Sequence, residues 1–179
     1  MPPSTHHDEP LWFPAIGTLV FVITVPGTVI GIVPFLLSRW NLAPPFFGWL
    51  LTRWLGVALI VGAAPIFFDF VIRFASEGRG TPAPIAPTRH LVVGGVFRYV
   101  RNPGYIAVVS LLIGQGLLFG SASIVLYTTV VALAFHLFVL MYEEPTLRRQ
   151  FGKEYEAYCR EVPRWIPHLR RRVNPASPL

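Results

Sequence analysis

Chemically capable side chains stand at the two ends of one long apolar stretch of this sequence. Residues 102–142 contain no Asp, Glu, Lys or Arg over 41 positions. The polar residues at the two ends are Arg101, Asn102, Glu143 and Glu144. At ~1.5 Å per helical residue the stretch is roughly 60 Å long, about twice the ~30 Å hydrocarbon core of a bilayer. Because Gly120 lies near its middle, we predict a helical hairpin that returns both polar ends to one side of a membrane.

The two adjacent glutamates at the end of this stretch are the strongest candidates for chemistry. Carboxylates at the end of a membrane helix are costly to desolvate, so they need a cationic partner, water or a charged ligand. In a structural interpretation, Arg98, Arg101 or Arg164 neutralises the pair. In a functional interpretation, one of the two carboxylates lies beside a cationic ligand or hydrogen-bonds the hydroxyl groups of a ligand. His136, inside the stretch, either hydrogen-bonds a neighbouring helix or serves as a base.

The composition indicates an integral membrane protein. Of the 179 residues 53% are hydrophobic and 13% are charged, whereas soluble domains are roughly 25% charged. Uninterrupted apolar runs favour helices over a closed barrel. We therefore predict an all-α fold, a polytopic transmembrane bundle of about four spans, formed by residues 1–179 as a single domain. Five spans are the alternative, because Pro26-Gly27 either kinks the first apolar run, 10–38, or breaks it into two segments.

The chain divides into three regions around this bundle. Residues 1–77 supply the N-terminal spans, of which the second is predicted at about residues 46–70. Residues 78–168 carry the candidate site, and residues 169–179 form a basic tail. Residues 78–90 hold three prolines and two glycines, so we predict a surface loop there.

An amphipathic helix of about 17 residues is predicted after the glutamate pair, lying against the bundle or in the headgroup region. Pro145 suits its first turn and should force Glu144 out of helical geometry, so the fourth span should bend there. Apolar or aromatic residues then recur at helical spacing, at Leu147, Phe151, Tyr155, Tyr158 and Val162. Pro163 ends the helix, and Arg164 and Trp165 follow where they can close over the hairpin mouth.

The net charge of +6 is explained by membrane topology and does not predict a nucleic-acid partner. Most basic residues flank the apolar runs, and the loop between residues 73 and 101 shares its side with the basic C-terminal region. The positive-inside tendency therefore places both termini and the candidate site in the cytoplasm, with Arg39 opposite. Arg98 and the tail arginines, 170–172, are candidates for contacts with anionic membrane lipids.

A metal site is not predicted. Cys159 is the only cysteine, which excludes an intrachain disulfide and a cysteine cluster. His6 and His7 lie near the start of the chain, and we do not predict that they bind a metal. Gly114-Gln115-Gly116, about three turns above Asn102, either admits a flat ligand such as a cofactor or lets another helix approach closely.

The ordered combination of three sequence patterns resembles a known family. The patterns are RHLVVGGVFRYVRNPGY at 89–105, EEPxL at 143–147 and FGxxYxxYxxxVPRWxP at 151–167. They resemble the membrane-embedded methyltransferases of the isoprenylcysteine carboxyl methyltransferase and phospholipid methyltransferase family, over roughly residues 78–168. The resemblance implies S-adenosylmethionine as cofactor, held at the cytosolic side of a helical bundle. Consistently, the sequence has no strand followed by the G-x-G-x-x-G pattern of a dinucleotide-binding fold.

The resemblance assigns roles to particular residues of this chain. The catalytic candidates are Asn102, Glu143 and Glu144. The implied cofactor-binding residues are Arg89, His90, Leu91, Val92, Phe97, Arg101, Asn102, Pro103, Tyr105 and Glu143, to which we add Gly114 and Gly116. The substrate-binding candidates are Arg164, Trp165 and His136. Two positions depart from the family pattern, because Asn102 stands where His is common and Phe97 where Tyr is common. The arginine that carboxyl methyltransferases carry before the acidic pair is also missing from residues 137–141.

These observations predict a membrane methyltransferase whose acceptor is a lipophilic small molecule or a prenylated substrate. Carboxyl O-methylation of an isoprenylcysteine-like acceptor is favoured. N-methylation of a phospholipid or a small amine is the alternative within enzymes. A non-catalytic membrane protein that binds lipid through its basic face is the alternative from another class. No obligate protein partner is evident, and the acceptor is expected to enter from the bilayer between the hairpin and the second span.

Overall fold

The computed structural model of the chain describes residues 24–76 and 91–167. Every regular element within these residues is helical, which confirms the all-α class for this part of the chain. The predicted loop at 78–90, with Arg89 and His90, lies outside the described residues. The same is true of the first part of the first apolar run, of His6 and His7, and of the basic tail.

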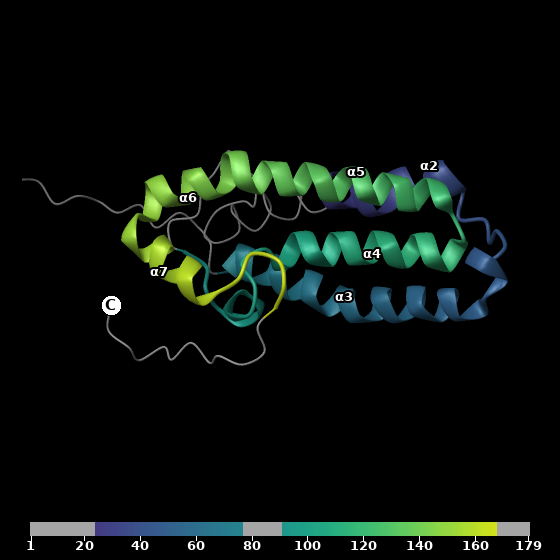
Figure 1. Cartoon of the computed structure of the whole chain (residues 1–179), viewed down its shortest axis with the longest axis horizontal. Helices are drawn as coiled ribbons and strands as arrows, with labels where there is room; N and C mark the ends of the chain where they lie inside the picture. Colours follow the sequence, from purple (N-terminus) through teal and green to yellow (C-terminus); the bar gives the residue numbers. More distant parts are fainter. Residues whose placement is uncertain (1–23, 77–90, 168–179) are drawn as a thin grey trace, which may run out of the picture.

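Three long helices lie side by side and give the molecule its elongated shape (Figure 1). Helix α4 (Pro103–Phe119) lies between α3 (Leu50–Ser76) and α5 (Ala122–Phe138), and it contacts both. Helix α2 (Val33–Ser38) packs on α5 and α4 at one end of the bundle. Helices α6 (Glu144–Phe151) and α7 (Lys153–Glu161) lie at the other end.

Two helical segments among the described residues are long and apolar enough to cross a membrane, namely Leu50–Arg73 and Ala122–Phe151. Two further apolar segments are shorter, Thr24–Ser38 and Pro103–Phe119. At ~1.5 Å per residue, the 17 residues of α4 extend about 25 Å, slightly less than a typical hydrocarbon core.

The hairpin turn lies where the sequence predicts it. Helix α4 ends at Phe119, and Gly120 follows with a left-handed φ of 64°. A β-carbon on Gly120 would collide with the carbonyl oxygen of Pro44, so the turn also requires the absence of a side chain. Ser121 begins the next helix, and its hydroxyl accepts a hydrogen bond of 3.4 Å from the backbone N–H of Ile124.

The predicted departure of Glu144 from helical geometry is wrong. Glu144 is helical, with φ −62° and ψ −43°, and the chain continues from α5 into α6 through the π-helix η4 (Val139–Glu143). The N–H of Glu144 donates to the carbonyl of Val139, five residues earlier. A proline ring collides with the carbonyl four residues before it, and the widened turn just before Pro145 accommodates that ring.

The predicted single amphipathic helix is two helices. It breaks at Gly152, whose φ of 50° and ψ of −122° separate α6 from α7. The apolar spacing nevertheless indicates the buried face correctly, because Tyr155 is 3% exposed and Val162 is 1% exposed. These helices contact the end of the bundle, which is one of the two predicted locations.

Candidate active site at the hairpin mouth

The structure brings the two polar ends of the apolar stretch together. The Tyr105 hydroxyl, in the first turn of α4, donates a hydrogen bond of 2.8 Å to Oε2 of Glu143. Arg101, just before α4, places Nη1 3.1 Å from Oε1 of Glu144. Because α4 and α5 are antiparallel neighbours, residues about 40 positions apart in sequence share one site.

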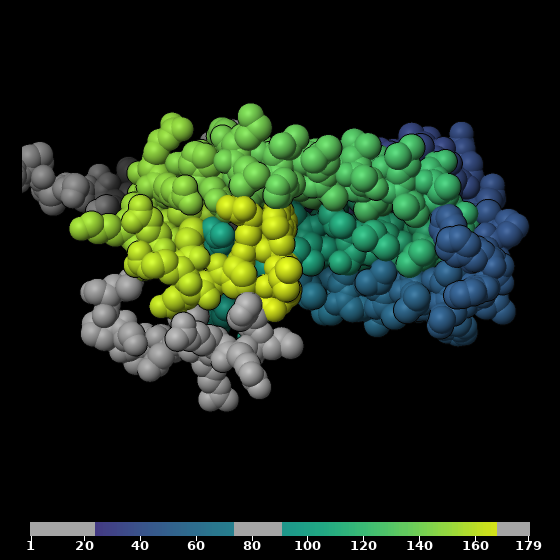
Figure 2. Space-filling view, viewed as in Figure 1, coloured from purple at the N-terminus to yellow at the C-terminus, as the bar shows by residue number. Residues whose placement is uncertain are grey.

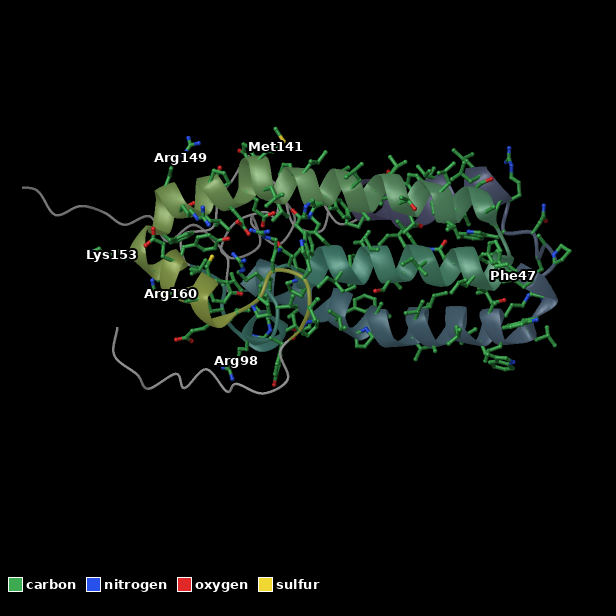
Figure 3. The ribbon with its side chains drawn as sticks, in the orientation of Figure 1. Phe47, Arg98, Met141, Arg149, Lys153 and Arg160 are labelled. Carbon is green, nitrogen blue, oxygen red and sulfur yellow. The ribbon has the colours of Figure 1, made fainter. Side chains whose placement is uncertain are left out.

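Glu144 lies at the centre of three arginines. Its side chain is 5% exposed, and Arg164 donates to both carboxylate oxygens, from Nε at 2.6 Å and Nη2 at 2.9 Å. Arg148 contacts the carboxylate at 3.8 Å with a side chain that is 55% exposed. We call Arg101, Glu144, Arg148 and Arg164 the arginine cluster. Arg98, the third predicted partner, points away from the bundle (Figure 3). The structural interpretation therefore applies to Glu144.

Residues 162–167, which we call the strap, cover the beginning of α4 (Figure 2). The backbone N–H of Arg101 donates to the carbonyl of Pro163 at 2.9 Å. The side-chain amide of Asn102, which is 7% exposed, donates to the carbonyl of Arg164 at 3.2 Å. The Arg164 pair with Glu144 and these two bonds fix the strap from one side, and buried Val162 anchors its beginning.

A cavity of about 180 Å³ lies inside this mouth. Polar or aromatic side chains line one part of it: Phe97, Arg101, Asn102, Tyr105, Glu143, Glu144, Tyr155 and Tyr158. Apolar side chains line it as well, and we call the space that they border the apolar compartment: Val25, Pro26, Val29, Phe67, Phe70, Val108 and Phe135. Leu91, Val92 and Pro103, which the resemblance assigns to the cofactor, also line the cavity. The cavity therefore presents both polar and apolar surface to a ligand.

Glu143 has surroundings unlike those of Glu144. It lines the cavity, and within the described residues no arginine or lysine nitrogen lies within ion-pair distance of it. Its polar contact is the Tyr105 hydroxyl, and the Tyr105 ring packs on Phe135 with 4.6 Å between centroids. A half-buried carboxylate without a cationic partner, facing a cavity, is suited to a positively charged ligand.

Sequence reasoning missed Tyr155 and Tyr158 as cavity residues. The Tyr158 hydroxyl donates a hydrogen bond of 2.7 Å to the carbonyl of Phe97, which fixes α7 against the segment before α4. Burial raises the pKa of both tyrosines, so their hydroxyls stay protonated and remain hydrogen-bond donors near neutral pH. The signal was present in the sequence, because both residues lie on the predicted inner face of the C-terminal helix.

Gly114 and Gly116 do not line this cavity, and both lie at helix contacts. A β-carbon on Gly114 would lie 2.8 Å from the carbonyl oxygen of Gly56 in α3. A β-carbon on Gly116 would lie 2.8 Å from the side chain of Val125 in α5. Of the two predicted interpretations, close helix packing describes these glycines, since a bulkier residue at either position would separate α4 from a neighbour.

His136 and Trp165 lie together but in a different place from the other candidates. Their rings are 5.9 Å apart between centroids, and both line a second cavity between α4 and α5. Tyr105 and Phe135 line both cavities and therefore separate them. The indole nitrogen of Trp165 is buried and has no hydrogen-bond partner among the described residues. His136 is thus separated from Glu143 by an aromatic wall.

The chain is similar to known proteins over part of its length. A family model described as "Phospholipid methyltransferase" matches residues 51–154, more than half of the chain. Two rice proteins, from the indica and japonica subspecies of Oryza sativa, are both named "Probable protein-S-isoprenylcysteine O-methyltransferase". Each is 32% identical to this chain over 79 residues, which cover 44% of this chain and 41% of the relative. The similarity thus spans about two fifths of the length of these relatives.

Proposed function

Because the chain belongs to the phospholipid methyltransferase family, we propose that it transfers a methyl group from S-adenosylmethionine to a lipophilic acceptor in the hairpin mouth. One observation carries this proposal. Glu143 presents a carboxylate without a cationic partner, among the described residues, to a cavity that has both a polar and an apolar part.

The polar part of the cavity suits this methyl donor. S-adenosylmethionine supplies an electrophilic methyl group on a positively charged sulfur, and it also carries an adenine ring and an amino-acid group. Glu143 would offset positive charge on the donor, and Asn102 would hydrogen-bond its polar groups. Phe97, Tyr155 and Tyr158 provide aromatic surface for the adenine.

The protein chiefly has to position two reactants and exclude water. Methyl transfer from a sulfonium needs in-line geometry and a desolvated site more than it needs an acid or a base. Buried Val100 and Val162 and the strap close one side of the mouth, while the arginine cluster holds the strap through Glu144. In this proposal Glu144 positions the closing segment and Glu143 touches the donor.

The apolar compartment suits the chain of a lipophilic acceptor, and we favour a carboxyl group as the reacting end. A carboxylate is already nucleophilic at neutral pH, whereas an amine must first lose a proton. Asn102 cannot act as a base, and His136 lies in the other cavity. The names of the rice relatives support an isoprenylcysteine-like acceptor. A phospholipid or small-amine acceptor remains the alternative, with Glu143 as the available base.

We further propose a membrane bundle of about four spans with the mouth at the cytoplasmic face. Arg149, Lys153 and Arg160 point outward at the mouth end of the molecule, and Phe47 lies at the opposite end (Figure 3). Phe47, Trp49 and Trp54 are 89%, 65% and 70% exposed, as aromatic residues at a membrane interface would be.

Binding of radiolabelled S-adenosylmethionine to the purified protein tests the donor site. Wild type should bind the donor, Glu143→Ala should bind it about tenfold or more weakly, and the exposed Glu156→Ala serves as the matched control. Equal binding by Glu143→Ala would remove Glu143 from the site. Absence of binding by wild type would contradict the enzyme and favour the non-catalytic lipid-binding alternative.

Incubation with a total lipid extract and labelled donor tests the acceptor class. Label released by mild alkali indicates a methyl ester, and alkali-stable label indicates a methylated amine. Mass spectrometry of the labelled lipid then identifies the acceptor. We expect alkali-labile label, and stable label in lipid amines would select the alternative.

A further inference from the structure

Three consecutive residues of α4 face three different helices. Gly114 packs on α3 and Gly116 packs on α5, as described above. Between them, the Gln115 side chain donates from Nε2 to the carbonyl of Ile30 at 2.9 Å, in the first described helical segment. Successive residues of an α-helix point about 100° apart, so a triplet can contact three neighbours at one level of the bundle. The proposed function makes no use of Gln115.

The segment that receives this hydrogen bond is a π-helix, η1 (Gly27–Ile32). The Tyr127 hydroxyl of α5 donates to the carbonyl of the preceding residue, Val29, at 3.4 Å. Pro34, in the following helix α2, has no backbone N–H to donate to a carbonyl of this segment. The widened π-turn and donors from neighbouring helices satisfy the carbonyls that are affected. Side chains from α4 and α5 therefore fix both the position and the rotation of η1.

The same segment forms one wall of the apolar compartment. Val25, Pro26 and Val29 line the cavity together with Phe67 of α3 and Val108 of α4. Val29 is thus held through its carbonyl by Tyr127 and faces the cavity with its side chain. A rotation of the segment by one residue, about 100°, would replace these side chains with different ones and change the width of the compartment.

We propose that Gln115, assisted by Tyr127, is a positioning residue that determines which acceptor chains the protein accepts. It does so by holding η1 as the wall of the apolar compartment. The inference rests on the proposed function and deepens it, because it assigns the acceptor's apolar chain to the space between η1, α3 and α4. The class of ligand is a single extended hydrocarbon chain attached to a polar reacting group.

The other atom of the Gln115 amide makes this proposal testable. Its Oε1 is buried and has no partner among the described residues, which is a cost to folding. Gln115→Met keeps a similar volume and removes both the hydrogen bond and the unpaired oxygen. The thermal unfolding midpoint should therefore change little, so a change in acceptor handling reports the position of η1 and not general loss of structure.

Kinetics with defined acceptors measure this effect. The probes are N-acetyl-S-geranyl-, S-farnesyl- and S-geranylgeranyl-cysteine, with labelled S-adenosylmethionine. For Gln115→Met we expect the KM of the preferred acceptor to rise about tenfold and the preference for chain length to weaken, while donor affinity stays unchanged. Tyr127→Phe should produce a smaller change in the same direction, since its hydrogen bond is long. Thr129→Val, which removes an exposed hydroxyl from α5, is the control.

A photocrosslinking experiment separates failure of this inference from failure of the proposed function. A farnesyl-like chain that carries a diazirine, attached to N-acetylcysteine, should label residues 25–32 in wild type and shift its label in Gln115→Met. Crosslinking at residues 25–32 without methylation would support their role as a wall of the apolar compartment and contradict the proposed reaction. Methylation with crosslinks elsewhere, or an unchanged KM and chain preference in Gln115→Met, would overturn the inference and leave the reaction intact.

Discussion

Two neighbouring regions of the hairpin mouth use the same residue type for opposite purposes. In the arginine cluster, Glu144 is 4% exposed and pairs with three arginines. At the cavity, Glu143 contacts the Tyr105 hydroxyl and has no ion pair among the described residues. Both glutamates line the same cavity, but they have different partners, because successive helical residues are about 100° apart.

A membrane protein can keep one carboxylate available for a ligand while arginines neutralise its neighbour. In the arginine cluster, the charge of Glu144 is compensated by arginines. One of them, Arg164, belongs to the strap, so the ion pair holds the strap in place. The second carboxylate is held by a neutral donor, which orients it and leaves its charge uncompensated. If this contrast holds, changes in the arginine cluster should lower stability, and changes at Glu143 should weaken ligand binding.

The largest expected effect is on folding, from Glu144→Gln. This change leaves Arg101 and Arg164 without their common anion in a largely buried position, and we expect a loss of about 3 kcal/mol in the free energy of unfolding. Thermal unfolding in detergent measures the stability, and limited proteolysis at residues 162–167 reports release of the strap. If Glu144→Gln unfolds like wild type, the cluster does not hold the mouth together.

Glu143→Gln should weaken donor binding and leave folding intact. We expect the affinity for S-adenosylmethionine to fall about thirtyfold, or ~2 kcal/mol, because a charged contact becomes a neutral one. The unfolding midpoint should not fall, since no arginine loses a partner. Isothermal titration and thermal unfolding on the same preparation check both parts. A variant that unfolds early but binds normally would reverse the roles of the two glutamates.

Tyr105→Phe should have a smaller effect that depends on Glu143. Loss of the hydroxyl removes the donor to a half-buried carboxylate, and we expect about 1 kcal/mol less stability. In the Glu143→Gln background the same change should cost less, and a double-mutant cycle measures the difference. Equal effects in both backgrounds would show that the charge of Glu143 adds nothing to the stability of the 2.8 Å contact.

Arg148→Ala should have the smallest effect of the four. Its guanidinium lies 3.8 Å from Glu144 and its side chain is 55% exposed, so we expect a loss below about 0.5 kcal/mol. Arg164→Ala, which removes the bidentate partner, provides the comparison within the same cluster and should lower the unfolding midpoint clearly. A larger effect for Arg148 than for Arg164 would contradict the ranking by burial and geometry.

Patterns along the chain were sufficient to predict the hairpin and its turn at Gly120. They also indicated the buried face of the C-terminal helices, because apolar spacing survives the break at Gly152. The break itself and the helical geometry of Glu144 were not predicted. Both depend on how a backbone accommodates a glycine or a proline when neighbouring helices can widen or satisfy a turn.

Several residues that line the cavity were predicted from the sequence, but their contacts with one another were not. Asn102, Tyr105 and Glu143 meet as expected, while Gly114 and Gly116 serve helix packing and His136 faces another cavity. Arg89 and His90 lie outside the described residues, so their cofactor role stays a prediction. Tyr155 and Tyr158 belong to the site because α7 packs against the segment before α4.

The sequence by itself determined that two polar ends of an apolar hairpin must meet, because hydrocarbon excludes charge and the chain has one turn between them. It also determined the family, because motif order is a property of the chain. The fold sets which glutamate pairs with arginines and which, among the described residues, contacts the Tyr105 hydroxyl instead. That choice depends on rotation about a helix axis and on arginines from distant segments, which no local pattern records.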